Sequence, residues 1–574
     1  MSGSVASSET PVWLSRYPKS VPPHVEIPSQ LLTEFVEKSV RTWPDRTALV
    51  YYGAKWSYRR FWEESERLAG ALAREAGIGP GDRVALYLPN CPAYPIAFFA
   101  VLRLGAIVVQ VSPLYIQQDL IHILHDSTPK ALVTLEILYP NVKQVRDAAP
   151  VPRVFVARLR EFYPTLVRPF VNSVLRRQHL PTAFPTDPEV RAWRTAVRTP
   201  ATVPLWRGDP ATTVAVLQYT GGTTGRPKAA MLSHRNLVAN VLQAQAWNTR
   251  RRPGQEVMMG AIPFFHIYGL TIALLLGFAD GATVILQTRP EVAELIRLIH
   301  RHRPTQFPAV PALYRALSQR PDVAKFDLHS IQFCLSGSAP LPVEVQREFE
   351  ALTGAALVEG YGLSEASPAT HANPVDGERR IGSIGLPLPD TFHRVVDPED
   401  RRRVLGVDEI GELEVRGPQV MLGYYGQPEE TGLVLTDGWL QTGDLARIDA
   451  DGYAYIVDRK KDMVNVGGMK VYPREVEEII YQHPSVAEAA AVGVPDAEHG
   501  EVIKAFVVKR PGATVSAEEI IAFVRARIAH YKAPRTVEFR DALPRTGVQK
   551  VLRRVLREGA IAGSETPPSP PRAP

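Results

Sequence analysis

Apolar residues along the first part of the chain gather into short runs that alternate with segments of helical spacing. The run RVALYLPN is followed by the helical segment AYPIAFFAVLRLG, the run AIVVQVSP, a helical segment through DLIHILHDS, and the run KALVTLE. Buried strands that alternate with helices are typical of βαβ units around a parallel sheet. We therefore predict an α/β fold, with βαβ-type regions over about 30–210 and 211–385.

The pattern changes after residue 385. Short strands broken by Gly and Asp, such as GELEVRG and DGYAYIVD, predict a small β-barrel or antiparallel sheet over 386–459. Residues 460–560 mix strands with amphipathic helices and predict a compact α+β domain. The charged DRKK segment at 458–461 joins this small domain to the large one, 1–459, although composition alone equally suits a solvated turn. The proline-rich tail, 561–574, is predicted to be disordered.

Composition excludes several classes of protein. The 574 residues are 45% apolar and 22% charged, and 66 basic residues nearly balance 60 acidic ones, which gives no nucleic-acid footprint. Cys91 and Cys334 lie in apolar surroundings that favour reduced core thiols. The N-terminal residues lack a basic start and an apolar stretch, and no apolar run approaches the ~20 residues that span a bilayer. We expect a cytoplasmic protein.

Residues 219–228, YTGGTTGRPK, have the composition of a loop that binds phosphate. Glycines allow backbone amides to approach phosphate oxygens, hydroxyls add donors, and Lys228 supplies a cation. The loop does not fit the G-x-x-x-x-G-K-[ST] template, because Arg226 and Pro227 separate Gly225 from the lysine. A flexible linker is the alternative, but the buried run TTVAVLQ before it and a helical segment after it, with Ser233 as the predicted N-cap, oppose that interpretation.

Further motifs follow in a fixed order: GSAP at 337–340, EGYGLSE at 359–365, TGD at 442–444, DRKKDMVNVGG at 458–468 and LPRTGVQK at 543–550. Together they resemble the adenylate-forming superfamily of acyl-CoA synthetases, firefly-type luciferases and peptide-synthetase adenylation domains. LQYTGGTTG, VRGPQVMLGYY and VYPREVEEII are most similar to bacterial long-chain fatty acyl-CoA synthetases. This resemblance implies that ATP and Mg²⁺ activate a fatty acid through an acyl-adenylate, which then passes to CoA.

The resemblance also implies roles for individual residues. The catalytic residues would be Lys550, which bridges the substrate carboxylate and the α-phosphate, Glu365, which binds Mg²⁺ beside Thr220, and His266 near the acyl pocket. Lys461 would be the hinge of a mobile C-terminal domain, and Gly467 and Gly468 would line the CoA path. The residues implied in ATP or AMP binding are Thr220, Gly221, Gly222, Thr223, Thr224, Gly225, Lys228, Gly337, Ser338, Ala339, Pro340, Glu359, Gly360, Tyr361, Gly362, Ser364, Asp444 and Arg459.

Some alternatives remain open at this point. Gln549 stands directly before Lys550, where the family usually has glycine, so we expect reduced rather than abolished adenylation. His266 also suits a core histidine, and Asp444 a turn cap. The runner-up functions are a fatty acyl-AMP ligase that delivers to a carrier protein, and a fatty-acid-binding or uptake protein with a weakened ATP site.

Residues 158–180 carry five arginines and place Phe162, Leu166, Phe170 and Val174 at four-residue spacing. A basic amphipathic element of this kind predicts peripheral contact with an anionic membrane, on the inner face. Pro164 and Pro169 are predicted to interrupt a helix, so a surface insertion packed on the large domain is an equal alternative. Fatty acid, ATP and CoA are the expected partners, and the protein is expected to be a monomer or a homodimer.

Overall fold

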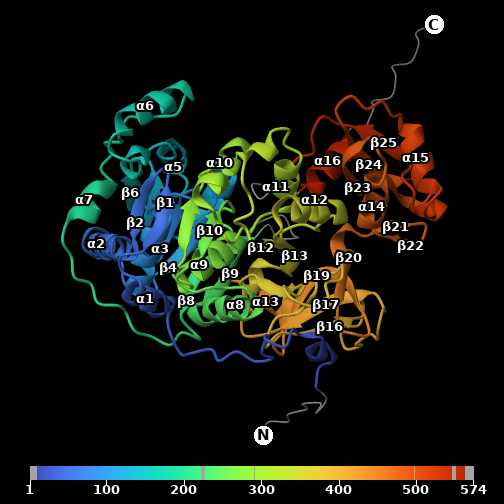
Figure 1. The fold of residues 1–574 in the computed structure, drawn as a ribbon, viewed down its shortest axis with the longest axis horizontal. Coiled ribbons are helices and arrows are strands. Elements are labelled where there is room, and N and C mark those ends of the chain that lie inside the picture. Colours follow the sequence, from blue (N-terminus) through green and yellow to red (C-terminus); the bar gives the residue numbers. More distant parts are fainter. Residues whose placement is uncertain (1–9, 221–226, 290, 497, 546–550, 563–574) are drawn as a thin grey trace. The chain divides into compact units, whose positions relative to one another are not determined.

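The computed structural model describes residues 10–220, 227–289, 291–496, 498–545 and 551–562 (Figure 1). The chain forms two compact units. Unit 1 comprises Met1–His393, Val415–Leu440 and Asp451–Tyr453, and unit 2 comprises Arg394–Glu414, Gln441–Ala450 and Ala454–Pro574. Strands and helices alternate through most of unit 1, which confirms the α/β class.

A seven-stranded sheet in unit 1 has the order β7-β6-β5-β3-β4-β8-β9. All neighbouring strands are parallel except the β8·β9 pair. The predicted strand runs therefore form one parallel sheet, as the βαβ rhythm indicated. Its strands are β3 (Arg83–Tyr87), β4 (Ile107–Val111), β5 (Ala131–Leu135), β6 (Arg153–Ala157), β7 (Val190–Ala192), β8 (Val214–Thr220) and β9 (Lys228–Ser233).

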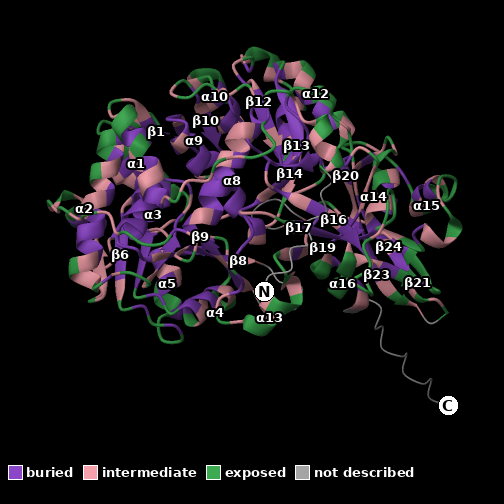
Figure 2. Ribbon diagram, turned by 90° about the horizontal axis from the view of Figure 1, so that it is seen from below, coloured by how far each residue is buried: buried purple, intermediate pink, exposed green. Residues whose placement is uncertain are grey.

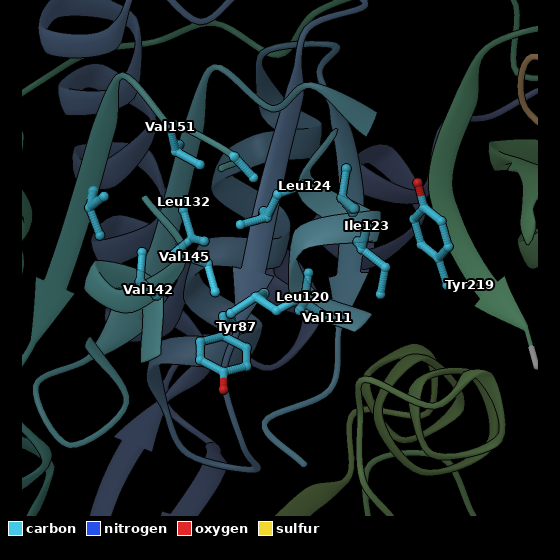
Figure 3. Close-up of a cluster of buried hydrophobic side chains, with 14 of the residues drawn as sticks. Tyr87, Val111, Leu120, Ile123, Leu124, Leu132, Val142, Val145, Val151 and Tyr219 are labelled. Carbon is cyan, nitrogen blue, oxygen red and sulfur yellow. The ribbon is translucent and has the colours of Figure 1, made fainter. Parts of the chain in front are cut away.

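Helices α4 (Gln117–Ser127) and α5 (Tyr139–Val145) bury one apolar face each against this sheet. Figure 3 shows Leu120, Ile123 and Leu124 of α4 beside Leu132 and other strand side chains. Every residue of α3 (Ala93–Arg103) is buried, as expected for a helix that is apolar on all sides. Burial of these apolar faces holds the sheet, and with it the ends of its strands, in place.

A second sheet in unit 1 contains strands that are distant in sequence. The order β10-β11-β1-β2 includes a parallel β1·β11 pair. Strand β1, from the predicted region 30–210, therefore belongs to a sheet formed with strands of the predicted region 211–385. Parallel bridges from Gln306 to Met258 and Phe333 link β10 to β12, which continues the order β12-β13-β14-β15. The strands are β1 (Thr47–Tyr51), β2 (Ala54–Ser57), β10 (Val257–Gly260), β11 (Thr283–Leu286), β12 (Phe333–Ser336), β13 (Ala356–Gly362), β14 (Ala369–Ala372) and β15 (Leu386–Pro387).

The segment after residue 385 forms mostly antiparallel structure. One five-stranded sheet has the order β16-β17-β19-β18, with β20 beside β19, and its β18·β19 and β19·β20 pairs are antiparallel as predicted. The sheet of the C-terminal segment has the order β22-β21-β24-β23, with β25 beside β24. These strands are β16 (Phe392–Val396), β17 (Gly411–Arg416), β18 (Leu435–Thr436), β19 (Trp439–Ile448), β20 (Ala454–Arg459), β21 (Val464–Val466), β22 (Met469–Val471), β23 (Val486–Asp496), β24 (Gly500–Lys509) and β25 (Thr536–Phe539).

Most of the other helices are amphipathic, and Figure 2 shows buried and exposed residues along them. The remaining α-helices are α1 (Leu32–Thr42), α2 (Tyr58–Ala76), α6 (Arg168–Arg177), α7 (Trp193–Arg198), α8 (His234–Trp247), α9 (Leu276–Ala279), α10 (Val292–His302), α11 (Pro311–Ser318), α12 (Val343–Thr353), α13 (Pro428–Val434), α14 (Pro473–Tyr481), α15 (Ala517–Arg525) and α16 (Arg553–Ala562). Short 3-10 or π turns are η1 (Val12–Arg16), η2 (Leu159–Phe162), η3 (Gly269–Leu275), η4 (Val323–Lys325), η5 (Ser364–Ala366), η6 (Lys460–Asp462) and η7 (His530–Lys532).

Segment 158–180 differs from its sequence-based prediction in two ways. Pro169 lies in the first turn of α6 and does not interrupt it, because the first helical amides need no partner within the helix. Phe162 is buried, so it does not share a surface with the other apolar residues of the predicted stripe. Cys91 and Cys334 are free and buried, as predicted. None of the helices that the structure describes is both long and apolar enough to cross a membrane.

Candidate functional site

The antiparallel hairpin of β8 and β9 holds the two ends of the predicted phosphate loop together. Thr220 and Lys228 are paired across the hairpin, at the last residue of β8 and the first of β9. Residues Gly221, Gly222, Thr223, Thr224 and Gly225 lie outside the described residues. The sequence did not predict β9, but the helix after it begins as expected, since the Ser233 hydroxyl accepts a hydrogen bond of 3.1 Å from the Asn236 amide.

Lys228 lies between an acidic side chain and an aromatic ring. Its ammonium forms an ion pair with Glu430 of α13 and lies 5.5 Å from the ring centroid of Tyr424. Residues 422–425 run along the free edge of β9, where the Tyr425 amide donates to the Ala229 carbonyl at 2.8 Å. Backbone pairing therefore fixes Tyr424 beside the phosphate-loop hairpin, and neither Tyr424 nor Glu430 was a candidate from sequence.

The GSAP and EGYG motifs meet because they follow neighbouring parallel strands. Ser336, the last residue of β12, is paired with Glu359 of β13, so Gly337–Pro340 leave the sheet at the edge where Tyr361 and Gly362 lie. A Cβ on Gly362 would lie 2.0 Å from the Pro368 carbonyl oxygen, so only glycine fits there. A Cβ on Gly337 would touch the Tyr268 ring at 3.3 Å. Gly360 precedes Tyr361 within β13, and Ala339 follows Ser338.

Ser338 adopts a left-handed backbone conformation, with φ of 68°. This region costs a non-glycine residue about 1 kcal/mol, and such strain is concentrated at functional sites. The role of the GSAP turn in ATP binding stays a prediction.

Glu365 is held from two directions. It lies in η5, directly after Ser364, and its carbonyl accepts a hydrogen bond of 2.8 Å from the Met421 amide. Its carboxylate accepts a hydrogen bond of 2.9 Å from the Tyr424 hydroxyl. Burial and the nearby Glu365 carboxylate raise the pKa of Tyr424 well above its ordinary value, so the hydroxyl keeps its proton. Tyr424 thus contacts both the metal-binding candidate and the phosphate-binding candidate.

His266 lies in the turn between β10 and the π-helical η3, at intermediate burial. The Gln218 side chain of β8 donates to the Phe265 carbonyl at 3.2 Å, and the Tyr268 hydroxyl donates to the Leu335 carbonyl of β12 at 2.6 Å. These bonds tie the His266 turn to both sheets. Strand β12 is in turn paired with β13, Tyr424 is hydrogen-bonded to Glu365, and Tyr424 forms a bridge to β9. The candidate residues of unit 1 are therefore linked to one another through direct contacts.

Asp444 and Arg459 form a pair within unit 2. They are paired across β19 and β20, and the Arg459 Nε lies 3.5 Å from a carboxylate oxygen of Asp444. Asp444 is buried, and its amide donates to the Thr442 hydroxyl at 3.2 Å. Burial and the neighbouring Arg459 lower the pKa of Lys461, the hinge candidate in η6.

Gly467 and Gly468 form the two-residue turn between β21 and β22. Both have positive φ, 58° and 86°, which two-residue hairpin turns favour. The turn geometry therefore gives a second reason for these glycines, besides their predicted place on the CoA path. Lys550 and Gln549 lie outside the described residues, but Arg545 and Val551 on either side of them form an antiparallel bridge.

The described residues offer few acidic or histidine side chains together to a metal ion. Among the described residues, no group of three or more His, Cys, Asp or Glu side chains is arranged to hold a metal ion. The Glu365 carboxylate accepts a hydrogen bond from the Tyr424 hydroxyl, and carboxylate oxygens are ligands of the kind that Mg²⁺ prefers. A magnesium site with one protein carboxylate and phosphate oxygens fits this arrangement.

The chain is similar to known proteins along nearly its whole length. The sequence model of the family described as "AMP-binding enzyme" matches residues 36–425, and that of its C-terminal domain matches residues 475–550. The chain is 41% identical to the "Long-chain-fatty-acid--CoA ligase" of Bacillus subtilis strain 168, over 95% of this chain and 97% of that protein. It is 40% identical to the Escherichia coli O157:H7 protein of the same name, over 96% and 98%. The structure of ATP-bound MatB from Rhodopseudomonas palustris is similar with a TM-score of 0.81 and 30% identity, over 92% of this chain and 99% of that one.

Proposed function

Because this chain belongs to the AMP-binding enzyme family, we propose that it is an ATP-dependent long-chain fatty acid:CoA ligase. The observation that carries the proposal is the similarity, over nearly the full length of both chains, to two proteins named long-chain-fatty-acid--CoA ligase. The contacts that link Lys228, Tyr424 and Glu365 support it, because they gather a cation and a carboxylate beside the phosphate-loop hairpin.

The reaction needs two steps, because direct attack of a thiol on a carboxylate would have to expel an oxide ion, which is too poor a leaving group. A carboxylate oxygen of the fatty acid first attacks the α-phosphorus of ATP, and the bond to pyrophosphate breaks. The CoA sulfur then attacks the acyl carbon of the acyl-adenylate, the thiol loses its proton, and AMP leaves. Negative charge spreads over phosphate oxygens in the first step, so positioned cations and donors account for most of the acceleration.

We assign the ends of the phosphate loop to the leaving pyrophosphate. Thr220 supplies a hydroxyl and Lys228 a positive charge from opposite strands of one hairpin. Glu365 and Thr220 would hold Mg²⁺, and Tyr424 orients the Glu365 carboxylate. When bound, the ion would neutralise negative charge on the phosphate groups.

The adenosine part of ATP is assigned to the aromatic and acidic candidates that the resemblance implies. The Tyr361 ring offers a face for adenine opposite the Gly337–Pro340 turn, and Asp444 with Arg459 is suited to the ribose hydroxyls. Lys550 neutralises the reacting carboxylate and α-phosphate, with Lys461 as the hinge of the C-terminal domain and Gly467 and Gly468 on the CoA path. His266 orients the substrate carboxylate beside the acyl channel.

The test follows the products of one incubation. Purified protein is mixed with palmitate, ATP and Mg²⁺, with and without CoA, and pyrophosphate, AMP and palmitoyl-CoA are measured by mass spectrometry. Palmitoyl-CoA in equal amount to AMP, lost in Glu365→Gln and Lys550→Ala, is the expected result. Palmitoyl-AMP without thioester would identify a ligase that uses a carrier protein. Palmitate binding without pyrophosphate release would identify a fatty-acid-binding protein.

We further propose that α6 docks the enzyme on an anionic membrane, from which a long-chain substrate is taken. In Figure 1, α6 lies at the margin of unit 1. Val171 and Leu175 face the protein, whereas Leu166 (87% exposed), Phe170 (68%) and Val174 (50%) face outward. Arg176 and Arg177 are exposed at its C-terminal end. An exposed apolar face with arginines beside it suits the boundary between lipid headgroups and acyl chains.

Vesicle flotation tests this docking. The variant Phe170→Ser/Val174→Ser changes exposed side chains only, so the fold is retained. It is expected to lose most of its flotation with vesicles that contain phosphatidylglycerol, whereas Val407→Ser, which changes an aliphatic side chain that is 61% exposed elsewhere, floats like the unchanged protein. Equal flotation of all three proteins would refute the docking proposal but not the ligase reaction.

A further inference from the structure

The ion pair of Lys228 and Glu430 joins a predicted phosphate ligand to an acidic residue that the reaction does not require. The Lys228 side chain is only 12% exposed, whereas that of Glu430 is 36% exposed. The lysine therefore lies in a confined position, and its acidic partner lies at the margin of that position.

Local contacts hold Glu430 at this place. The Thr431 hydroxyl, next to it in α13, donates to the Gln427 carbonyl at 2.8 Å and accepts from the Tyr424 amide at 2.8 Å. Tyr425, which follows Tyr424 in the chain, donates a hydrogen bond from its amide to the Ala229 carbonyl in β9. Helix α13 is thus bound through its first turn to the strand that carries Lys228. The ion pair is consequently a feature of the fold and not of a loose surface chain.

The ion pair of Lys228 and Glu430 is favourable without nucleotide and unfavourable when phosphate is bound. Without phosphate, a nearly buried ammonium needs a negative partner, because an unpaired charge away from water is costly. With phosphate at Lys228, the Glu430 carboxylate lies beside a polyanion of the same sign. It must then leave the lysine and turn toward solvent, which its exposure allows.

We propose that the Glu430 carboxylate pairs with the Lys228 ammonium in the nucleotide-free enzyme, in the place that a phosphate group would take. Glu430 therefore competes with ATP and pyrophosphate for Lys228. The inference rests on the proposed role of Lys228. Glu430 keeps the Lys228 ammonium over the Tyr424 ring, and it weakens the binding of nucleotide and of the pyrophosphate product. It is a positioning residue that tunes affinity, and it takes no part in bond making.

Isothermal titration with ATP, and separately with pyrophosphate, in the absence of fatty acid tests the competition without turnover. Glu430→Gln keeps the size of the side chain and removes its charge. Its dissociation constants are expected to fall about two- to fivefold, the range of a partly exposed ion pair. Glu429→Gln is the matched control, because Glu429 is the adjacent, exposed acid of the same helical turn. It is expected to bind like the unchanged protein.

A double-mutant cycle separates competition from a general structural effect. In a Lys228→Met background, Glu430→Gln is expected to lose its effect on ATP affinity, because the charge for which both anions compete has gone. Equal or weaker binding by Glu430→Gln, or an effect that persists in the Lys228→Met background, would overturn the proposal. If Lys228→Met alone binds ATP and pyrophosphate like the unchanged protein, the assignment of Lys228 to phosphate has failed instead.

Discussion

The hydroxyl of Tyr424 lies 2.9 Å from Oε1 of Glu365, and it donates the hydrogen bond that orients this carboxylate. The ring of the same tyrosine lies 5.5 Å from the ammonium of Lys228. Tyr424 therefore lies between the Glu365 carboxylate and the Lys228 ammonium. It contacts both the carboxylate proposed to bind metal and the ammonium proposed to bind phosphate.

Removal of this hydroxyl should impair nucleotide use without loss of the fold. Tyr424→Phe deletes a hydrogen bond to a charged group, which is worth roughly 1.5 kcal/mol, so kcat/KM for ATP should fall about tenfold. Pyrophosphate release at several Mg²⁺ concentrations measures the change. Tyr425→Phe is the control, and an equal fall in both variants would argue against a specific role for the Tyr424 hydroxyl.

The Asp444 carboxylate should act on ATP and not on the fatty acid. Asp444→Asn removes a charge that pairs with Arg459 and weakens an acceptor for ribose hydroxyls, so KM for ATP should rise by about tenfold while KM for palmitate stays the same. Asp437→Asn serves as control, because Asp437 is exposed and asparagine tolerates its positive φ of 52°. A parallel rise of both KM values would contradict the ribose assignment.

Arg553 should stabilise the C-terminal part of unit 2. Its guanidinium binds Asp458 at 3.1 Å, Asp462 at 3.2 Å and Glu477 at 2.7 Å. Burial by itself lowers the pKa of Arg553, but these carboxylates together raise it, and burial raises the pKa of Glu477. Arg553→Met leaves the acids unpaired and should lower the free energy of unfolding by about 3 kcal/mol, as measured by denaturant titration. Arg554→Met, at an exposed neighbour, should have little effect.

Glu136 should make stability depend on pH. Burial raises its pKa from 4.5 to about 7, against the hydrogen bond from the Leu159 amide, which lowers it. The folded state therefore holds this proton more tightly than the unfolded state, and stability present at low pH is lost as pH rises through about 7. Relative to Glu136→Gln, the protein should lose about 1.4 kcal/mol per pH unit between roughly 4.5 and 7.

Urea unfolding at pH 5, 6, 7 and 8 checks this dependence. The difference between the two proteins should level off above pH 7, where Glu136 is ionised in both states. Glu498→Gln, which changes an exposed carboxyl, is expected to follow the unchanged protein. A constant difference between the unchanged protein and Glu136→Gln over this range would show that Glu136 titrates normally.

Local patterns predicted many elements correctly. The strand runs before residue 150, the buried β8, and the helix capped by Ser233 were all expected, because periodicity and capping depend on residues a few positions apart. The strand β9 was not expected, since its pairing with β8 and with residues 422–425 is what makes it a strand. Likewise, β1 joined the second sheet through a partner more than 200 residues away, which no local pattern records.

The amino-acid sequence by itself determined the rhythm of strands and helices, the order of the motifs, and the residue types that the chemistry needs. Only the tertiary structure decided which of them meet. Lys228 and Glu430 are 202 residues apart, and Glu365 and Tyr424 are 59 apart. Their contacts depend on how whole strands and helices pack, and packing energy is shared among many residues that are distant in sequence. A motif can therefore predict that Lys228 binds phosphate, but it cannot predict that Glu430 is the carboxylate proposed to compete for Lys228.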